Sequence, residues 1–261
     1  MILVFDVGNT ETTIGLYDGE SLRGHWRVTT DVDRTPDELA LLIRALLTAD
    51  GIDRGAIDRA AIGSVVPALT GPLAEACEQA VGAKAFIIDA RSPLPIHLDV
   101  EEPLTVGADR IINTLAASRL YGRDTIVVDL GTATTYDCIT ADGVFLGGVI
   151  APGVRTSAET LFRRTSKLPA TEITPPARVI GRRTEECIRS GVVLGSAEAI
   201  DGLVRRIKAE WPGREIPLVV ATGGLAAVFQ PFCKELDLIE PYLTLNGLRI
   251  AHELVAAAAV S

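Results

Sequence analysis

The chain has 261 residues, of which 48% are hydrophobic and 23% charged, and it carries a net charge of −9. At about 150 residues per domain this length predicts one large or two small domains, and the composition excludes a disordered chain. The negative charge argues against a nucleic-acid-binding protein and against binding to an anionic membrane surface, because both require clustered Lys and Arg side chains. It does not exclude polyphosphate ligands, which backbone N–H groups and a metal ion can bind locally.

The N-terminal apolar run ends at Asp6 and no basic region precedes it, so we expect no secretory signal. The longest uncharged run, 216–233, contains two prolines and a pair of glycines, which predicts a strand, a turn and a helix rather than a membrane span. The four cysteines lie far apart with no C-x-x-C pair, which predicts buried, reduced thiols and excludes a zinc site: Cys77, Cys138, Cys187 and Cys233. Together these features predict a cytoplasmic protein.

The first half of the chain predicts a β-meander followed by alternating helices and strands. Short apolar or Thr-rich stretches between polar turns indicate three strands, at 2–5, 12–17 and 23–29. Pro36 is typical of the first turn of a helix. The elements expected after this helix are a strand at 60–64, a helix at 67–81, a strand at 85–89, a Pro-rich loop at 92–103 and a helix at 108–120. This alternation predicts an α/β sheet.

The second half of the chain repeats the opening of the first. Residues 126–143 match residues 3–19 in order: an apolar strand, Asp-x-Gly with Thr or Asn next, a Thr-rich strand and a closing Asp-Gly turn. Chance similarity between two hairpins is the alternative. If the repeat is real, two similar α/β domains, 1–121 and 122–261, each offer an Asp-x-Gly loop to a shared cleft. The later elements expected are a Gly-rich strand and turn at 147–153, a helix ending near 162, a loop at 165–176, a long helix at 185–210, a strand at 218–221 and a helix at 245–260.

Two loops contain the residue types that phosphoryl transfer requires. At 6–10, the glycine lets the backbone approach a phosphate, the Asn and Thr offer hydrogen-bond donors, and Asp6 can orient a hydrated Mg²⁺. The loop at 129–132 has the same character. Either loop alone is equally well explained as a polar hairpin turn, whereas a pair at corresponding points of two domains favours a phosphate clamp. The chain contains neither a P-loop nor a Rossmann glycine motif.

Three further segments are candidates for ligand binding. Thr222-Gly223-Gly224 ends a strand, where adenine or ribose could lie against bare backbone, and a simple strand-to-helix turn is the alternative. In the segment 107–110, which opens a helix, Asp109 could accept a proton from a substrate hydroxyl while Arg110 holds an anionic or amide-bearing tail. The alternative is that Asp109 only complements the helix dipole. Thr184 fits the N-cap of the long helix better than a ligand contact.

Taken in chain order, these motifs resemble the type III pantothenate kinases of the actin-like superfamily, which also includes sugar kinases, actin and acetate kinase. The resemblance covers essentially the whole chain, through D-x-G-N-T at 6–10, V-G-A-D-R at 106–110, D-x-G-T at 129–132, G-G-x-I-x-P-G at 147–153, T-G-G at 222–224 and L-T-L-N-G-L at 243–248. It implies an α/β protein of two actin-like (ribonuclease H-like) domains with a nucleotide cleft between them. It also implies ATP-dependent phosphorylation of pantothenate to 4′-phosphopantothenate, the first step of coenzyme A biosynthesis, by a cytoplasmic homodimer.

The resemblance further implies a role for each motif. Asp109 accepts the proton of the pantothenate hydroxyl, and Asp129 holds a monovalent cation, K⁺ or NH₄⁺. ATP binds the first phosphate loop and one residue of the second, with Asp6 near Mg²⁺: Asp6, Val7, Gly8, Asn9, Thr10, Glu11, Thr12, Thr13 and Thr132. Gly223 and Gly224 border the adenosine. The pantothenate site includes Gly107, Ala108, Asp109 and Arg110, with Thr184 contacting the substrate near a dimer interface.

One position departs from the family pattern. Val100 stands where many members carry a Tyr seven residues before the glycine of G-A-D-R, so the hydrogen bond that this phenol makes to the substrate is missing. Two other functions also stay open. A phosphatase or another phosphotransferase of the superfamily would use the same loops, with water or a different acceptor, and a regulatory accessory protein would keep the fold without turnover.

Overall fold

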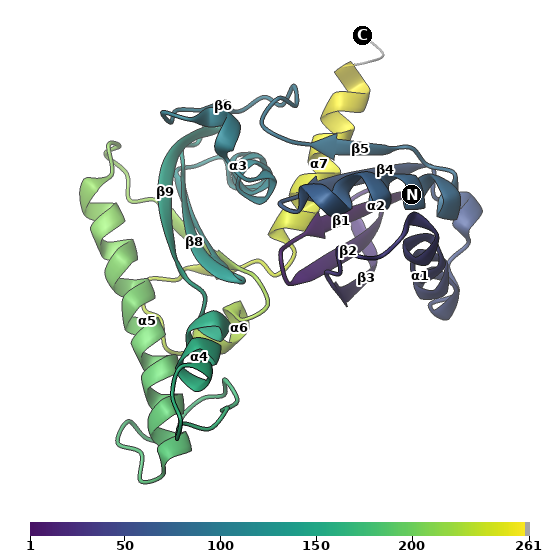
Figure 1. The fold of residues 1–261 in the computed structure, drawn as a ribbon. Coiled ribbons are helices and arrows are strands. Elements are labelled where there is room, and N and C mark those ends of the chain that lie inside the picture. Colours follow the sequence, from purple (N-terminus) through teal and green to yellow (C-terminus); the bar gives the residue numbers. More distant parts are fainter. Residues whose placement is uncertain (259–261) are drawn as a thin grey trace. The chain divides into compact units, whose positions relative to one another are not determined.

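The computed structural model describes residues 1–258 of the chain. Its contacts divide the chain into two compact units. The first unit comprises Met1–Arg119 and the C-terminal segment that begins at Leu243, and the second comprises Leu120–Tyr242. Figure 1 shows the helices and strands of both units, coloured along the chain.

The sheet of the first unit has the strand order β3-β2-β1-β4-β5. Its strands are β1 (Ile2–Val7), β2 (Glu11–Asp18), β3 (Ser21–Thr29), β4 (Arg59–Ser64) and β5 (Ala85–Ile88). The first three strands form the predicted antiparallel meander, and β4 and β5 add to β1 in parallel. Helices α1 (Pro36–Ala49) and α2 (Pro67–Val81) form a core with this sheet. Helix α1 begins with a capping box in which Thr35 and Glu38 exchange hydrogen bonds.

Two more helices, α3 (Ala108–Tyr121) and α7 (Leu243–Ala258), pack near β4 in this unit. The approach is close at glycines. A Cβ on Gly63 of β4 would collide with Ile112 of α3, and one on Gly247 of α7 would lie 2.5 Å from Ile112. The buried hydroxyl of Thr244 also donates to Oδ1 of Asn113 at 3.0 Å. The close packing of these helices therefore depends on glycine at positions 63 and 247, where a Cβ atom would collide with Ile112.

The predicted division of the chain into 1–121 and 122–261 differs from the structure at the C-terminus. Helix α7 returns to the first unit and contacts β1 and β4, as the yellow helix beside the purple strand shows in Figure 1. Its leucines at 243, 245 and 248 are buried. This apolar stripe is what attaches the helix to the first sheet, although it follows the second unit in sequence.

The second unit repeats the strand topology of the first. Its strands β7 (Thr125–Leu130), β8 (Ala133–Ile139), β9 (Val144–Pro152), β10 (Leu218–Thr222) and β11 (Leu238–Ile239) lie in the order β9-β8-β7-β10-β11. Neighbours have the same directions as their counterparts in the first sheet: β7, β8 and β9 pair antiparallel, and β10 and β11 parallel. The repeat read from the sequence is therefore a repeat of structure, and chance similarity of two hairpins is excluded.

The helices of the second unit are α4 (Val154–Arg163), α5 (Thr184–Glu210) and the short α6 (Ala226–Phe229). The long helix α5 packs its buried residues Val193, Ala197, Ile200 and Val204 in one core with alternate residues of β7. The remaining elements are β6 (His97–Leu98), in the predicted Pro-rich loop, and two 3₁₀ turns at Arg54–Ala56 and Pro103–Thr105.

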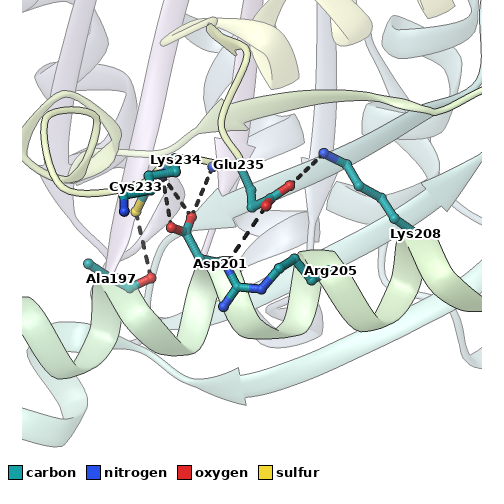
Figure 2. Close-up of polar contacts among 7 residues, drawn as sticks. All are labelled: Ala197, Asp201, Arg205, Lys208, Cys233, Lys234 and Glu235. Atoms are coloured by element: carbon teal, nitrogen blue, oxygen red, sulfur yellow. Dashed lines mark hydrogen bonds and ion pairs between the residues drawn. The ribbon is translucent and has the colours of Figure 1, made fainter.

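A buried carboxylate ties α5 to the segment that follows α6 (Figure 2). Asp201, only 4% exposed, accepts hydrogen bonds from the backbone N–H of Lys234 at 2.9–3.0 Å and from that of Glu235 at 3.1 Å. The carboxylate of Glu235 in turn pairs with Lys208 at 2.7 Å and Arg205 at 3.8 Å. Because both donors belong to the segment between α6 and β11, their hydrogen bonds to the buried carboxylate fix the connection between β10 and β11.

No helix among the described residues is long and apolar enough to cross a membrane. The uncharged run 216–233 contains strand β10, a glycine turn and helix α6, as predicted. All four cysteines are free, as predicted, but they are not all buried. Cys187 is exposed because it lies in the exposed first turn of α5. Cys138 is only partly buried.

Candidate active site

The first Asp-x-Gly loop is a tight turn between β1 and β2. The N–H of Gly8 donates to the carbonyl of Glu11 at 3.1 Å, and a Cβ on Gly8 would lie 3.0 Å from that same oxygen. Asn9, Thr10 and Glu11 are exposed, so the tip of the turn offers its polar groups to the solvent. This is the geometry that lets backbone N–H groups meet a phosphate.

Asp109 lies in the first turn of α3. The N–H of Arg110 donates to its Oδ1 at 2.9 Å, and a Cβ on Gly107 would lie 2.5 Å from the same oxygen. Burial raises the pKa of the Asp109 carboxyl, and the hydrogen bond and positive charge of Arg110 oppose part of that rise. A carboxylate with a raised pKa is a stronger base, which suits it to accept a proton from a hydroxyl group.

Asp6 and Asp109 belong to the same end and the same side of the first sheet. A Cβ on Gly15 of β2 would touch both Val4 of β1 and Leu245 of α7 at 3.0 Å, so Val4 points towards the α7 side. Because side chains alternate along a strand, Asp6 points to that side too. Its register partner in β4 is Gly63, the glycine on which α3 packs.

Helix α3 also packs against the segment just after β4, through residues at the start of the helix. A Cβ on Gly107 would lie 3.4 Å from Cγ1 of Val65, and the N–H of Val65 donates to the carbonyl of Val7 at 3.0 Å. The carboxyl ends of β1 and β4 and the N-terminus of α3 therefore meet. The structure brings the first phosphate loop and the segment 107–110 together within one unit.

The second Asp-x-Gly loop, between β7 and β8, has the same construction. Asp129 is the penultimate residue of β7, as Asp6 is of β1, and the N–H of Gly131 donates to the carbonyl of Ala133 at 3.1 Å. Gly153 lies against the loop so closely that a Cβ there would collide with the carbonyl of Thr132. Thr132 itself is exposed.

Gly223 completes the second loop. It follows Thr222, the register partner of Asp129 in β10, and adopts a φ of +89°. A Cβ on Gly223 would lie 2.6 Å from Oδ1 of Asp129 and 2.8 Å from the backbone of Leu130. Glycine is required at this position for both its conformation and its space.

Not every predicted site residue joins these clusters. Thr184 is exposed and is the first residue of α5, while the N-cap is Arg183 and makes no side-chain cap bond, so the N-cap interpretation of Thr184 is wrong. Val100 is partly buried in the segment after β6, and Gly224 is exposed before α6.

Two threonines missed by the sequence analysis contact the loops. Thr30 donates its hydroxyl to the carbonyl of Gly8, and Thr156 donates its hydroxyl to the carbonyl of Thr132, both at 2.7 Å. The sequence offered one indication of these contacts, namely that each threonine follows the third strand of its repeat.

Within residues 1–258 the structure contains no group of three or more His, Cys, Asp or Glu side chains that could hold a metal ion.

Comparisons with known proteins identify the family of the chain. A family model described as type III pantothenate kinase matches residues 2–206. The type III pantothenate kinase of Roseiflexus castenholzii is 46% identical over 254 residues, which cover 97% of this chain and 99% of the relative.

Two solved structures share the fold at low identity. The ethanolamine utilization protein EutJ from Carboxydothermus hydrogenoformans has a TM-score of 0.53 at 18% identity, with 94% of this chain and 88% of that chain covered. A ROK hexokinase from Thermus thermophilus has a TM-score of 0.50 at 15% identity, with 98% and 99% covered. The predicted actin-like α/β fold is confirmed.

Proposed function

The chain belongs to the type III pantothenate kinase family, and on that premise we propose which residues carry out its reaction. The protein uses ATP to phosphorylate pantothenate, the first step of coenzyme A biosynthesis. The two other functions that the sequence left open are not favoured. The observation that carries the residue assignment is the partly buried carboxylate of Asp109 beside the first phosphate loop.

Asp109 is the general base. The oxygen of the primary hydroxyl of pantothenate attacks the γ-phosphorus of ATP, the bond from that phosphorus to the β-phosphate oxygen breaks, and the hydroxyl proton passes to Oδ2 or Oδ1 of Asp109. ADP leaves with the electron pair of the broken bond. Positioning and charge stabilisation supply most of the catalysis in such transfers, and a general base adds about 10²- to 10⁴-fold.

The phosphate loops bind ATP. Residues 6–13 and Thr132 offer backbone N–H groups and hydroxyls to the phosphates, and Gly223 and Gly224 border the adenosine. Asp6 would hold Mg²⁺, directly or through water. When bound, the metal neutralises phosphate charge, which is how a chain of net charge −9 accepts a polyanion.

Asp129 would hold the monovalent cation, K⁺ or NH₄⁺. The position of Gly223 supports this assignment. Oδ1 of Asp129 and the backbone of Leu130 lie so close to Gly223 that no side chain fits between them. The cation adds one positive charge near the phosphates.

Pantothenate lies against Gly107, Ala108, Asp109 and Arg110 and is contacted by Thr184, with Val100 at the position of the family's frequent Tyr. The protein acts as a homodimer. Support for the dimer comes from apolar side chains that the second unit exposes to solvent: Phe162 (46%), Val179 (71%) and Ile180 (82%).

The test is a coupled assay of ADP release with ATP and Mg²⁺, with and without pantothenate, in K⁺ and in Na⁺ buffer. We expect ADP only when pantothenate is present, and faster release in K⁺. If the rate of ADP release does not depend on pantothenate, the proposal that pantothenate is the phosphoryl acceptor is wrong. Equal rates in K⁺ and Na⁺ would contradict the proposed cation site.

A further inference from the structure

Thr30, which follows β3, contacts the first phosphate loop through two hydrogen bonds. Its hydroxyl donates to the carbonyl of Gly8 at 2.7 Å, and its backbone N–H donates to the carbonyl of Thr10 at 3.0 Å. Thr30 thus binds two carbonyls of the loop that offers its N–H groups to phosphate.

Thr12 extends this contact into the sheet. Its hydroxyl lies 2.9 Å from that of Thr30, and Thr12 is only 4% exposed. A hydroxyl has one proton, and that of Thr30 goes to the Gly8 carbonyl, so Thr12 is the donor to Thr30. The three groups form a directed chain from Thr12 to Thr30 to Gly8, in which each bond polarises the next.

The geometry of the peptide unit gives this chain a consequence for phosphate binding. In a planar trans peptide the C=O of Gly8 and the N–H of Asn9 point in opposite directions. A hydroxyl that holds the carbonyl therefore also fixes the direction of the Asn9 N–H at the exposed tip of the loop. It keeps the carbonyl, a partial negative charge, turned away from the position of an anion.

The second loop has a similar contact, one residue further along the Asp-x-Gly-Thr motif than the contact at Gly8. Thr156, in the first turn of α4 directly after β9, donates its hydroxyl to the carbonyl of Thr132 at 2.7 Å. Thr30 and Thr156 each follow the third strand of a sheet with the same topology, and each holds a carbonyl of the Asp-x-Gly loop between the first two strands.

We propose that Thr30 and Thr156 are positioning residues for ATP, one for each phosphate loop, acting through the peptide units they orient and not by contact with the nucleotide. The proposal rests on the assignment of both loops to ATP. It requires that loss of either hydroxyl weakens the use of ATP and leaves the use of pantothenate unchanged.

The test uses the full-length protein with Thr30→Val, which keeps the shape and removes the hydroxyl, and Thr30→Ser, which restores it. The matched control is Thr29→Val at the exposed neighbouring position. The KM for ATP, the KM for pantothenate, kcat and the melting temperature are measured for each. We expect kcat/KM for ATP to fall about tenfold in Thr30→Val, the effect of one lost hydrogen bond, with the KM for pantothenate within twofold of wild type. Thr30→Ser is expected to recover most of the loss, and Thr29→Val to match wild type.

The second loop is tested in the same way with Thr156→Val. Its control is Thr160→Val, one turn further along α4. This pair tests the proposal independently if Thr30→Val does not fold. Wild-type kinetics for ATP in both threonine-to-valine variants would overturn the proposal. So would a loss that Thr30→Ser does not recover, or a loss confined to the KM for pantothenate. Absence of pantothenate phosphorylation by the wild-type protein itself would instead contradict the proposed function.

Discussion

Gly107 leaves the space that the carboxylate of Asp109 occupies. A Cβ on Gly107 would lie 2.5 Å from Oδ1 of Asp109, and the N–H of Arg110 holds that oxygen from the other direction at 2.9 Å. The position of the proposed base therefore depends on two neighbours: Gly107, which has no Cβ to displace the carboxylate, and the backbone N–H of Arg110, which donates to it. The glycine of the G-A-D-R motif thus has a steric role in placing the base.

The first prediction concerns this glycine. Gly107→Ala is expected to displace the Asp109 carboxylate and to lower kcat about 10²-fold, because a shift of about 1 Å in a reacting group has that effect. The melting temperature should change little, since the segment lies at a helix start. Gly191→Ala is the control: it lies in α5 with nothing within 4 Å of its Cβ, and alanine there should stabilise the helix by about 0.5–1 kcal/mol. Equal activities of Gly107→Ala and wild type would contradict the steric role.

The second prediction is a pH dependence of stability. Burial raises the pKa of Asp109 above its ordinary value of 3.8, so the folded protein binds this proton more tightly than the unfolded chain. The free energy of unfolding therefore falls as the pH rises from about 3.8 through the raised pKa, and the charged carboxylate is destabilising at neutral pH. Asp109→Asn should melt at or above the wild-type temperature at pH 7, and the difference should vanish towards pH 4.

Thermal melts of both proteins between pH 4 and pH 8 provide the check. Glu101→Gln, at an exposed carboxylate before α3, is the matched control for the loss of one carboxylate. An Asp109→Asn variant that melts below wild type at pH 7 would show that the charged carboxylate stabilises the fold, contrary to the effect of its burial.

The third prediction concerns the cation. Asp129→Ala should lose the acceleration by K⁺ over Na⁺, because the carboxylate beside Gly223 is the anionic donor of the proposed site. Glu198→Gln, an exposed carboxylate of α5 in the same unit, should keep it. The measurement is the initial rate against K⁺ concentration at constant ionic strength. Undiminished activation by K⁺ in Asp129→Ala would place the cation elsewhere.

The fourth prediction concerns the contact between α5 and the segment that follows α6. Asp201→Ala removes the acceptor of the N–H groups of Lys234 and Glu235 and should lower the free energy of unfolding by about 2–4 kcal/mol, because two backbone donors lose their charged acceptor. Asp201→Asn keeps one acceptor oxygen and should lose less. Denaturant unfolding measures both, and equal stability of Asp201→Ala and wild type would contradict the anchoring role.

The sequence predicted the elements whose pattern is local. The β-meander, the repeat around Asp6 and Asp129, and the helix at 67–81 follow from alternation, Thr-rich strands and turn residues within short windows. The steric roles of Gly107 and Gly223, which lie close to carboxylate oxygens, were not predicted from the sequence.

The features that the sequence did not predict depend on partners far along the chain. The apolar stripe of α7 would fit either sheet, and nothing local indicates that it packs on β1 and β4. The hydroxyl bonds of Thr30 and Thr156 span 22 and 24 residues, so neither threonine stands out from others in the sequence. Thr184 has the residue type of an N-cap, but the helix begins one residue earlier than such a cap requires.

The most direct test of the account is the yield of 4′-phosphopantothenate from ATP and pantothenate, measured by mass spectrometry for wild type and for Asp109→Asn. Wild type is expected to form the product stoichiometrically with ADP, and Asp109→Asn to form it 10²- to 10⁴-fold more slowly with an intact fold. An Asp109→Asn variant that makes the product at the wild-type rate would contradict the assignment of the base.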